Sequence, residues 1–192
     1  MYNKKVGKIN IFHKKLWKIL PVSLALILAA VYAFSKFSVP FSPKYAYNNV
    51  VLVSYVADGD TVKLKDGSWV RLIGIDTPEY HESEKLLRQA RRAKKDIASI
   101  KKMGALAKSF TQEILLNKKA RLEFDVEKRD KYKRLLAYIF LEDGTFVNAK
   151  IIEAGYAKIM TIPPNVKYAD MFRQLQEKAR TQKIGLWQEG YY

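Results

Sequence analysis

The chain has 192 residues, which suits one domain with a hydrophobic core plus additional segments. It has no cysteine, which excludes disulfides and thiolate metal sites, and only two histidines, too few for a typical imidazole zinc site. The formal net charge of +16 is large for this length and indicates an anionic partner, either nucleic acid or acidic lipid head groups.

The N-terminal part is predicted to be a targeting segment. Residues 19–35 are uncharged, lysines precede them, and at about 1.5 Å per residue they just span a ~30 Å hydrocarbon core. The lysines predict a basic cytoplasmic N-terminus over residues 1–18 and an exported domain. We expect residues 19–37 to be a transmembrane anchor or a cleaved signal segment, with a buried N-terminal helix as a third alternative. The domain would then be membrane-anchored outside the cytoplasm, or secreted.

A short linker over residues 38–48, rich in proline and aromatic residues, is expected to lead into a domain at 49–189. The domain begins with β-structure: a β-prone run at 50–56, an alternating segment at 61–64, and a third strand at 69–73 after the turn signal Asp66-Gly67. These segments predict a three-stranded meander.

Helical periodicity follows over residues 84–117, and Gly104 is expected to break it into two helices. The remaining elements are predicted as strands at 121–126 and 135–141, a helix at 148–154 capped by Asn148, an extended segment at 156–162, and a helix to residue 183 capped by Asn165. The whole pattern predicts an α+β, mainly β, domain: a five-stranded OB-type barrel with about three helices.

Two acidic clusters are candidates for a metal site. Asp60 begins one predicted strand and Asp76 ends another, and in a meander those ends lie on the same side of the sheet. The Thr77 carbonyl would add an oxygen ligand, and Asp58 and Glu79 would hold water around the ion. Such a donor set favours Ca²⁺ over a softer metal.

Each cluster also has an ordinary structural explanation. Asp58-Gly59-Asp60 is a common turn sequence, and Asp76-Thr77-Pro78-Glu79 resembles the start of a helix.

Arginine in the middle of an apolar strand is less common. Arg71 lies between Val70 and Leu72, so it would point to the polar face of a half-buried sheet. There it is either solvated or salt-bridged, or it holds a phosphate with its planar fork of donors. Arg134 lies in a run of charged residues, and such a run is also typical of a solvated turn.

Taken together and in order, these motifs resemble the staphylococcal nuclease (thermonuclease) family. They are Asp58-Gly59-Asp60-Thr61-Val62, the segment Arg71 to Glu79, Asp130-Lys131-Tyr132 with Arg134, Gly155-Tyr156-Ala157-Lys158 and Gly185-Leu186-Trp187. The resemblance implies an OB barrel with three helices. It also implies Ca²⁺-dependent endonuclease activity on DNA and RNA with little sequence specificity, giving 3′-phosphate products.

The resemblance also implies individual roles. Asp60, Asp76 and the Thr77 carbonyl would bind calcium. Arg71 and Arg134 would bind the phosphate, Glu79 would be the general base, and Lys131 and Tyr132 would border the nucleotide. The candidate site residues are therefore Asp58, Asp60, Arg71, Asp76, Thr77, Glu79, Lys131, Tyr132 and Arg134.

The chain departs from the family beside Arg134, where Lys133 and Leu135 replace the usual glycines, so the turn is expected to differ. It also lacks a tyrosine near Thr161, which predicts weaker base stacking there. A further set of basic residues on one predicted helix is either a solvated face or a track for polyanions: Arg88, Arg91, Arg92 and Lys95.

Two other functions remain as alternatives. The first is a catalytically weak nucleic-acid-binding module of the same fold. The second is adhesion to a lipid surface, which accounts for the N-terminal segment but not for the clustered acids and arginines. The sequence indicates no protein partner, and we expect a monomer.

Overall fold

The computed structural model of the chain describes residues 50–188. The predicted cytoplasmic segment 1–18, the anchor or signal segment 19–37 and the linker 38–48 lie outside the described residues. Within 50–188, none of the helices is both long enough and apolar enough to cross a membrane.

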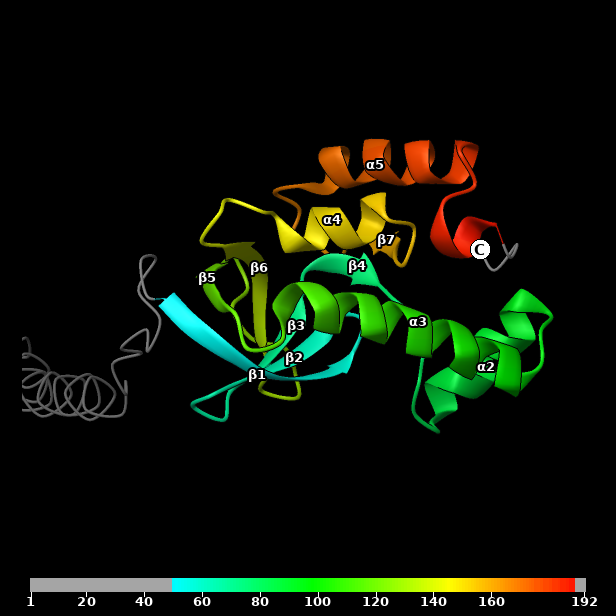
Figure 1. Cartoon of the computed structure of the whole chain (residues 1–192), viewed down its shortest axis with the longest axis horizontal. Helices are drawn as coiled ribbons and strands as arrows, with labels where there is room; N and C mark the ends of the chain where they lie inside the picture. Colours follow the sequence, from blue (N-terminus) through cyan, green and yellow to red (C-terminus); the bar gives the residue numbers. More distant parts are fainter. Residues whose placement is uncertain (1–49, 189–192) are drawn as a thin grey trace, which may run out of the picture. The chain divides into compact units, whose positions relative to one another are not determined.

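Five strands form a closed barrel in the order β1-β2-β3-β6-β5 (Figure 1). Their bounds are β1 Val50–Asp58, β2 Thr61–Leu64, β3 Trp69–Leu72, β5 Lys119–Glu123 and β6 Leu135–Leu141. β3 and β6 pair in parallel, and the other neighbours are antiparallel. The five-stranded barrel predicted from the sequence is confirmed.

Alternation of side chains along β2 and β3 separates the core from the outer face of the barrel. Val62, Leu64, Val70 and Leu72 point inward and are at most 2% exposed. The residues between them therefore point outward, because successive side chains of a strand lie on opposite faces. Arg71 belongs to this outer face.

A second, two-stranded sheet positions Asp76. β4 (Gly74–Asp76) pairs with β7 (Lys158–Met160) and is separated from β3 by Ile73. Gly74 makes this bend with φ +82, and a Cβ there would lie 2.5 Å from the Phe172 ring. Only glycine fits both the conformation and the contact. The third strand predicted at 69–73 is thus shorter than expected, and a new strand begins after it.

The long helical region is divided at a different place from the one predicted. α2 (Glu84–Ala93) ends at Lys94 with φ 51, and α3 (Ile97–Leu115) begins after Asp96, whose side chain accepts a hydrogen bond from Ser99 N. Gly104 lies inside α3 and is buried. A Cβ on Gly104 would lie 2.6 Å from the Glu79 carbonyl oxygen, so this glycine allows close packing and does not end a helix.

The C-terminal half contributes α4 (Val147–Glu153), α5 (Ala169–Thr181) and a 3₁₀ turn, η1 (Gly185–Trp187). Figure 1 shows α5 lying over α4, and α3 running from the barrel to α2, which packs against α3. The part of the chain that the structure describes has four α-helices, α2 to α5, where about three were expected.

Both asparagines predicted as helix caps have another role. Asn148 is buried inside α4, where it accepts a hydrogen bond from Ile139 N at 3.0 Å and donates one to the Ile73 carbonyl at 2.9 Å. Asn165 accepts from Glu127 N and donates to the Glu127 carbonyl, each at 2.8 Å. These amides satisfy backbone groups of distant segments, which a sequence pattern of local caps does not show.

Candidate active site

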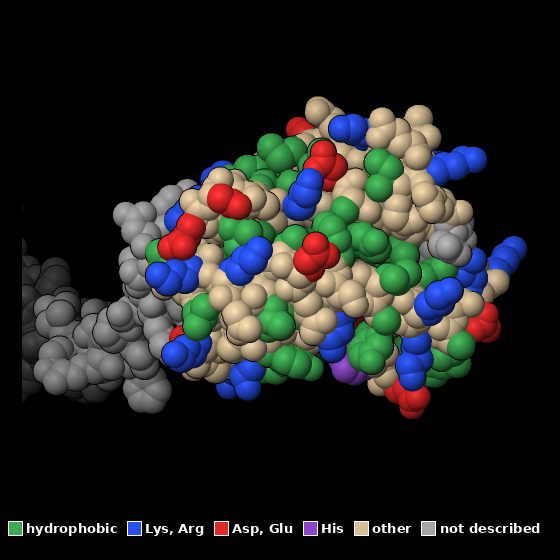
Figure 2. Space-filling model, viewed as in Figure 1, with side chains coloured by type: hydrophobic (Ala, Val, Ile, Leu, Met, Phe, Trp, Pro, Cys, Tyr) green, Lys and Arg blue, Asp and Glu red, His purple; other side chains and the backbone are tan. Residues whose placement is uncertain are grey.

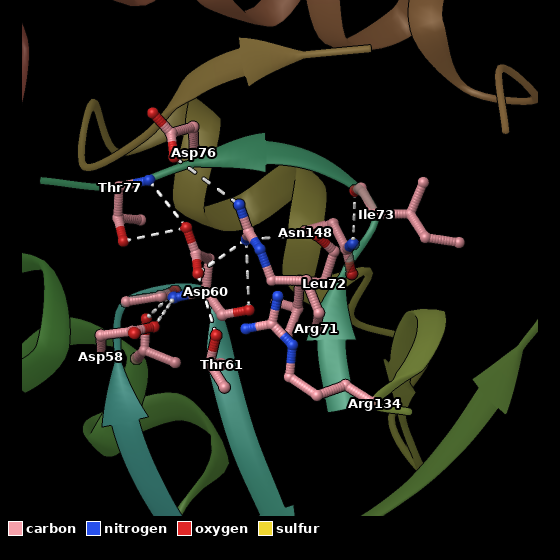
Figure 3. Close-up of polar contacts among 12 residues, drawn as sticks. Asp58, Asp60, Thr61, Arg71, Leu72, Ile73, Asp76, Thr77, Arg134 and Asn148 are labelled. Carbon is pink, nitrogen blue, oxygen red and sulfur yellow. Dashed lines mark hydrogen bonds and ion pairs between the residues drawn. The ribbon is translucent and has the colours of Figure 1, made fainter. Parts of the chain in front are cut away.

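An open cleft of about 760 Å³ lies where the β1–β2 turn, β3, β4 and α2 meet. Most of the residues that the sequence singled out line this cleft. They are Asp58, Asp60, Arg71, Asp76, Glu79, Arg88, Arg92 and Arg134. Figure 3 shows three of these acids, Asp58, Asp60 and Asp76, together with Arg71 and Arg134.

Arg71 connects the two aspartates. Its Nη1 lies 2.6 Å from Asp60 Oδ1, and its Nη2 lies 3.6 Å from Asp76 Oδ1 (Figure 3). Arg71 is only 8% exposed, so it is not a solvated surface arginine. The structure therefore brings together three residues from the β1–β2 turn, β3 and the end of β4.

The other oxygen of Asp60 holds Thr77. Thr77 N donates to Asp60 Oδ2 at 2.9 Å, and the Thr77 hydroxyl donates to the same oxygen at 3.2 Å. The Thr77 carbonyl accepts a hydrogen bond from Gln89 Nε2 at 3.4 Å. Gln89 Oε1 also accepts from Glu79 N at 2.8 Å, so one α2 side chain fixes the backbone of the acidic segment.

The acids differ in protonation because their surroundings differ. Burial, followed by the nearby charge of Asp60, raises the pKa of Asp58 to about 7. Burial opposes ionisation of Asp60, but the charges of Arg71 and Lys85 outweigh it and lower the pKa of Asp60. Asp60 N also donates to Asp58 Oδ1 at 3.0 Å, which fixes the relative position of the two acids.

Sequence reasoning missed three residues of the cleft. Lys85 Nζ lies 3.1 Å from Asp76 Oδ1 and 3.5 Å from Glu79 Oε2, and Lys158 Nζ lies 3.8 Å from Asp76 Oδ2. The third is Gln89. A signal was available for α2, because residues 85, 88, 89 and 92 follow the spacing of one helical face.

The basic track predicted on this helix is divided between two faces. Arg88 and Arg92 line the cleft, whereas Arg91 and Lys95 are not among its lining residues. Arg91 Nε donates to the Leu87 carbonyl at 3.4 Å. On the face drawn in Figure 2, Lys and Arg side chains are spread over the end of the molecule that α2 and α3 form.

Arg134 is held by a tight turn just before β6. Its Nε lies 2.7 Å from Asp130 Oδ2, and the other oxygen of Asp130 accepts hydrogen bonds from Tyr132 N and Arg134 N. Lys133 has φ 66, a conformation that glycine adopts more easily. The turn thus forms although lysine replaces the glycine usual in the family, and Arg134 still reaches the cleft.

Lys131 and Tyr132 lie on the same turn, at the rim of a neighbouring pocket of about 430 Å³. Arg71 and Arg134 line both this pocket and the main cleft. Tyr132 is 68% exposed, and Lys131 Nζ and Arg134 Cζ lie 5.1 and 5.5 Å from the centre of its ring.

The donor set fits a hard cation. The described residues contain no group of three or more His, Cys, Asp or Glu side chains arranged to hold a metal. Asp60, Asp76 and the Thr77 carbonyl offer oxygen atoms only, and Ca²⁺ completes its coordination with water. Asp60 and Asp76 line the same cleft and both contact Arg71, so their carboxylates lie close enough together to face one ion.

Comparison with known proteins places the chain in a family. A profile described as "Staphylococcal nuclease homologue" matches residues 69–189. A thermonuclease of Staphylococcus intermedius is 39% identical over 71% of this chain and 75% of that protein, and a thermonuclease of Staphylococcus hyicus is 33% identical over 91% and 98%. Endonuclease YncB of Bacillus subtilis is 33% identical over 74% of this chain and 63% of its own length. The chain therefore belongs to the family of staphylococcal nuclease homologues.

Proposed function

We propose that this protein is a Ca²⁺-dependent nuclease that hydrolyses phosphodiester bonds of DNA and RNA and leaves 3′-phosphate ends. The observation that carries the proposal is the buried Arg71 between Asp60 and Asp76, with Glu79 and Arg134 lining the same cleft. Relatives named thermonuclease and endonuclease support the same activity.

The two arginines bind the scissile phosphate. Each guanidinium offers several N–H donors in a plane, which matches the oxygens of a phosphate. Arg71 is fixed by its ion pairs, and Arg134 by its contact with Asp130. Because these groups are already oriented, they stabilise the charge that grows on the phosphate oxygens during attack by water.

Asp60, Asp76 and the Thr77 carbonyl are the residues that would hold the calcium ion. When bound, the ion supplies positive charge that polarises the phosphate. Thr77 and Asp60 are tied together by two hydrogen bonds, so these donors keep one arrangement. Asp58 Oδ1 accepts a hydrogen bond from Asp60 N and so fixes the backbone of Asp60.

Glu79 orients the attacking water or accepts its proton. Its backbone N–H donates to Gln89 and its Oε2 lies 3.5 Å from Lys85 Nζ, so the carboxylate is held in place for either role. Lys131 and Tyr132 border the nucleotide on the side of the second pocket, and Arg88 and Arg92 attract the polyanion to the cleft.

We further propose that residues 19–37 place the domain outside the cytoplasm, either as a retained anchor or as a cleaved signal. That segment lies outside the described residues, and its uncharged sequence after a lysine-rich stretch supports the proposal.

Cleavage assays on the full-length protein test the calcium assignment. Plasmid DNA and a folded RNA are incubated with added Ca²⁺ and, in parallel, with EGTA. We expect cleavage of both with Ca²⁺, none with EGTA, and 3′-phosphate ends on the products. Continued cleavage in EGTA contradicts the calcium assignment, and intact substrate in every condition favours a binding module of the same fold.

A further inference from the structure

Three strands of the barrel carry a second row of side chains parallel to the catalytic row. The catalytic row is formed by Asp58, Thr61 and Arg71, which are paired across β1, β2 and β3. The second row is formed by residues paired across the same strands, namely Tyr55, Lys63 and Trp69. The two rows point to the same face and lie about 7 Å apart along β2.

The second row exposes aromatic rings, which is unusual for an outer strand face without a partner. Trp69 is 38% exposed and Tyr55 is 43% exposed. Their rings meet edge to face with centroids 6.3 Å apart and an interplanar angle of 84°. Both rings therefore keep part of their surface exposed to solvent.

Lysines accompany these rings. Lys63 Nζ lies 5.3 Å from the centre of the Trp69 ring, and Lys108 Nζ, from α3, lies 5.5 Å from the Tyr55 ring. α3 packs against β1, so Lys108 reaches the ring of Tyr55 from the helix (Figure 1). The surface therefore combines partly exposed aromatic rings with positive charge, the combination that binds unpaired nucleotides through base stacking and phosphate contacts.

The surface also continues to the other end of the cleft. Lys108 Nζ lies 4.8 Å from the ring of Tyr80, which follows Glu79 directly in the chain. Tyr80 contacts the His81 ring edge to face, and His81 Nε2 lies 3.2 Å from the Ala57 carbonyl, which ties this segment back to β1. This surface thus begins at Trp69, two residues before Arg71, and ends at Tyr80, next to Glu79.

We propose that Trp69, Tyr55 and Tyr80 form a stacking platform that binds the unpaired bases next to the scissile phosphate. Lys63 and Lys108 pair with the phosphates of those nucleotides. The inference rests on the proposed nuclease function and assigns the residues that hold unpaired bases beside the cleaved bond. In a duplex the bases are stacked within the helix, so they are not available to these rings.

Equilibrium binding in EGTA tests the platform without any cleavage. The full-length protein is titrated into a labelled oligothymidylate of about 12 nucleotides, a length that suits a barrel of this type. We expect Trp69→Ala and Tyr55→Ala each to raise Kd by at least about fivefold, because stacking contributes that much per base. Trp69→Phe should retain most of the affinity.

Matched controls separate stacking from a structural role. Met171→Ala removes an apolar side chain of similar exposure, 44%, from α5, and should leave Kd unchanged. Trp69→Leu keeps an apolar side chain on the strand, so it should remain folded in thermal unfolding yet still lose single-strand affinity. Quenching of tryptophan fluorescence by the oligonucleotide should be smaller in Trp69→Phe than in the parent protein.

Two results would overturn the platform. One is an unchanged single-strand Kd in both alanine variants, which would point to another occupant such as a protein. The other is an equal loss of affinity for single strands and for a duplex of the same length. Ring-dependent binding without cleavage in Ca²⁺ would instead contradict the proposed nuclease function alone.

Discussion

Asp58 and Asp60 are separated by one residue, yet their surroundings shift their pKa values in opposite directions. Asp60 contacts Arg71 directly, whereas Asp58 is buried beside the charge of Asp60. At the residue scale, the negative charges of the two carboxylates are therefore not balanced equally by nearby positive charge. Arg71 neutralises part of the charge of Asp60, so on acidification Asp58 protonates before Asp60.

This difference predicts a pH dependence of stability in EGTA. The pKa of Asp58 is about 7 in the folded protein and near 3.8 when unfolded, so its protonated form stabilises the fold at low pH. That contribution is lost as the pH rises through the folded value. Asp58→Asn should therefore raise the melting temperature relative to the parent protein at about pH 8 and change it less at about pH 5.

Melting curves of both proteins across this range provide the measurement. The pKa of Asp60 is lowered by folding, so its contribution to stability changes only below the pKa that it has in the unfolded protein. That pH range lies below the interval from about pH 5 to about pH 8. Parallel profiles for the parent protein and Asp58→Asn would show that Asp58 does not titrate as described.

At the scale of elements, α2 and α3 determine how the acidic segment is held. α2 supplies Lys85 and Gln89 to it, and α3 passes so close to the Glu79 backbone that only glycine fits at position 104. These two helices therefore act as supports for Glu79, in addition to covering the barrel.

Gly104→Ala should disturb this support. A Cβ would lie 2.6 Å from the Glu79 carbonyl oxygen, so the backbone of Glu79 must shift. We expect a loss of about 1–3 kcal/mol in the free energy of unfolding and a fall in kcat larger than the change in KM. Ser109→Ala, at an exposed position of the same helix, is the control. If Gly104→Ala is destabilised but keeps the kcat of the parent protein, the packing at position 104 does not affect the role of Glu79 in catalysis.

The two faces of α2 make a second prediction at this scale. Arg88 and Arg92 line the cleft, whereas Arg91 and Lys94 do not. Replacing Arg88 and Arg92 by Gln should reduce the slope of log K against log salt for DNA binding by roughly 1.5–2. Replacing Arg91 and Lys94 by Gln removes the same charge and should reduce the slope less. Equal slopes in the two double variants would mean that only total charge matters.

For the whole molecule, the barrel could be predicted because its strands carry local signals. Alternation, β-prone residues and the turn at Asp66-Gly67 determine β1 to β3, and β6 was predicted with its observed bounds. The break at Lys94 and the buried role of Asn148 could not be predicted. The role of Asn148 depends on a contact with Ile73, far away in the sequence. The break is made by local caps at Lys94 and Asp96, in a stretch without the glycine or proline that usually marks a helix end.

The same distinction applies to the site. Asp60, Arg71 and Asp76 could be proposed from strand ends and from an arginine in an apolar strand. Lys85 and Lys158 could not, because their contact with Asp76 depends on how α2 and β7 are oriented in the folded protein. The spacing of residues 85, 88, 89 and 92 indicates one face of α2, but it does not show which carboxylate Lys85 approaches.

The central claim is that a phosphate is held at Arg71 between two aspartates, and single-turnover cleavage of a defined oligonucleotide tests it most directly. With saturating Ca²⁺ and substrate, Arg71→Ala should lower the rate of the chemical step by roughly 10²–10³, as for loss of one preorganised donor. Arg173→Ala, an exposed arginine on α5 paired with Asp170, serves as the matched control and should cleave at the parent rate. A folded Arg71→Ala protein that cleaves as fast as Arg173→Ala would contradict the account.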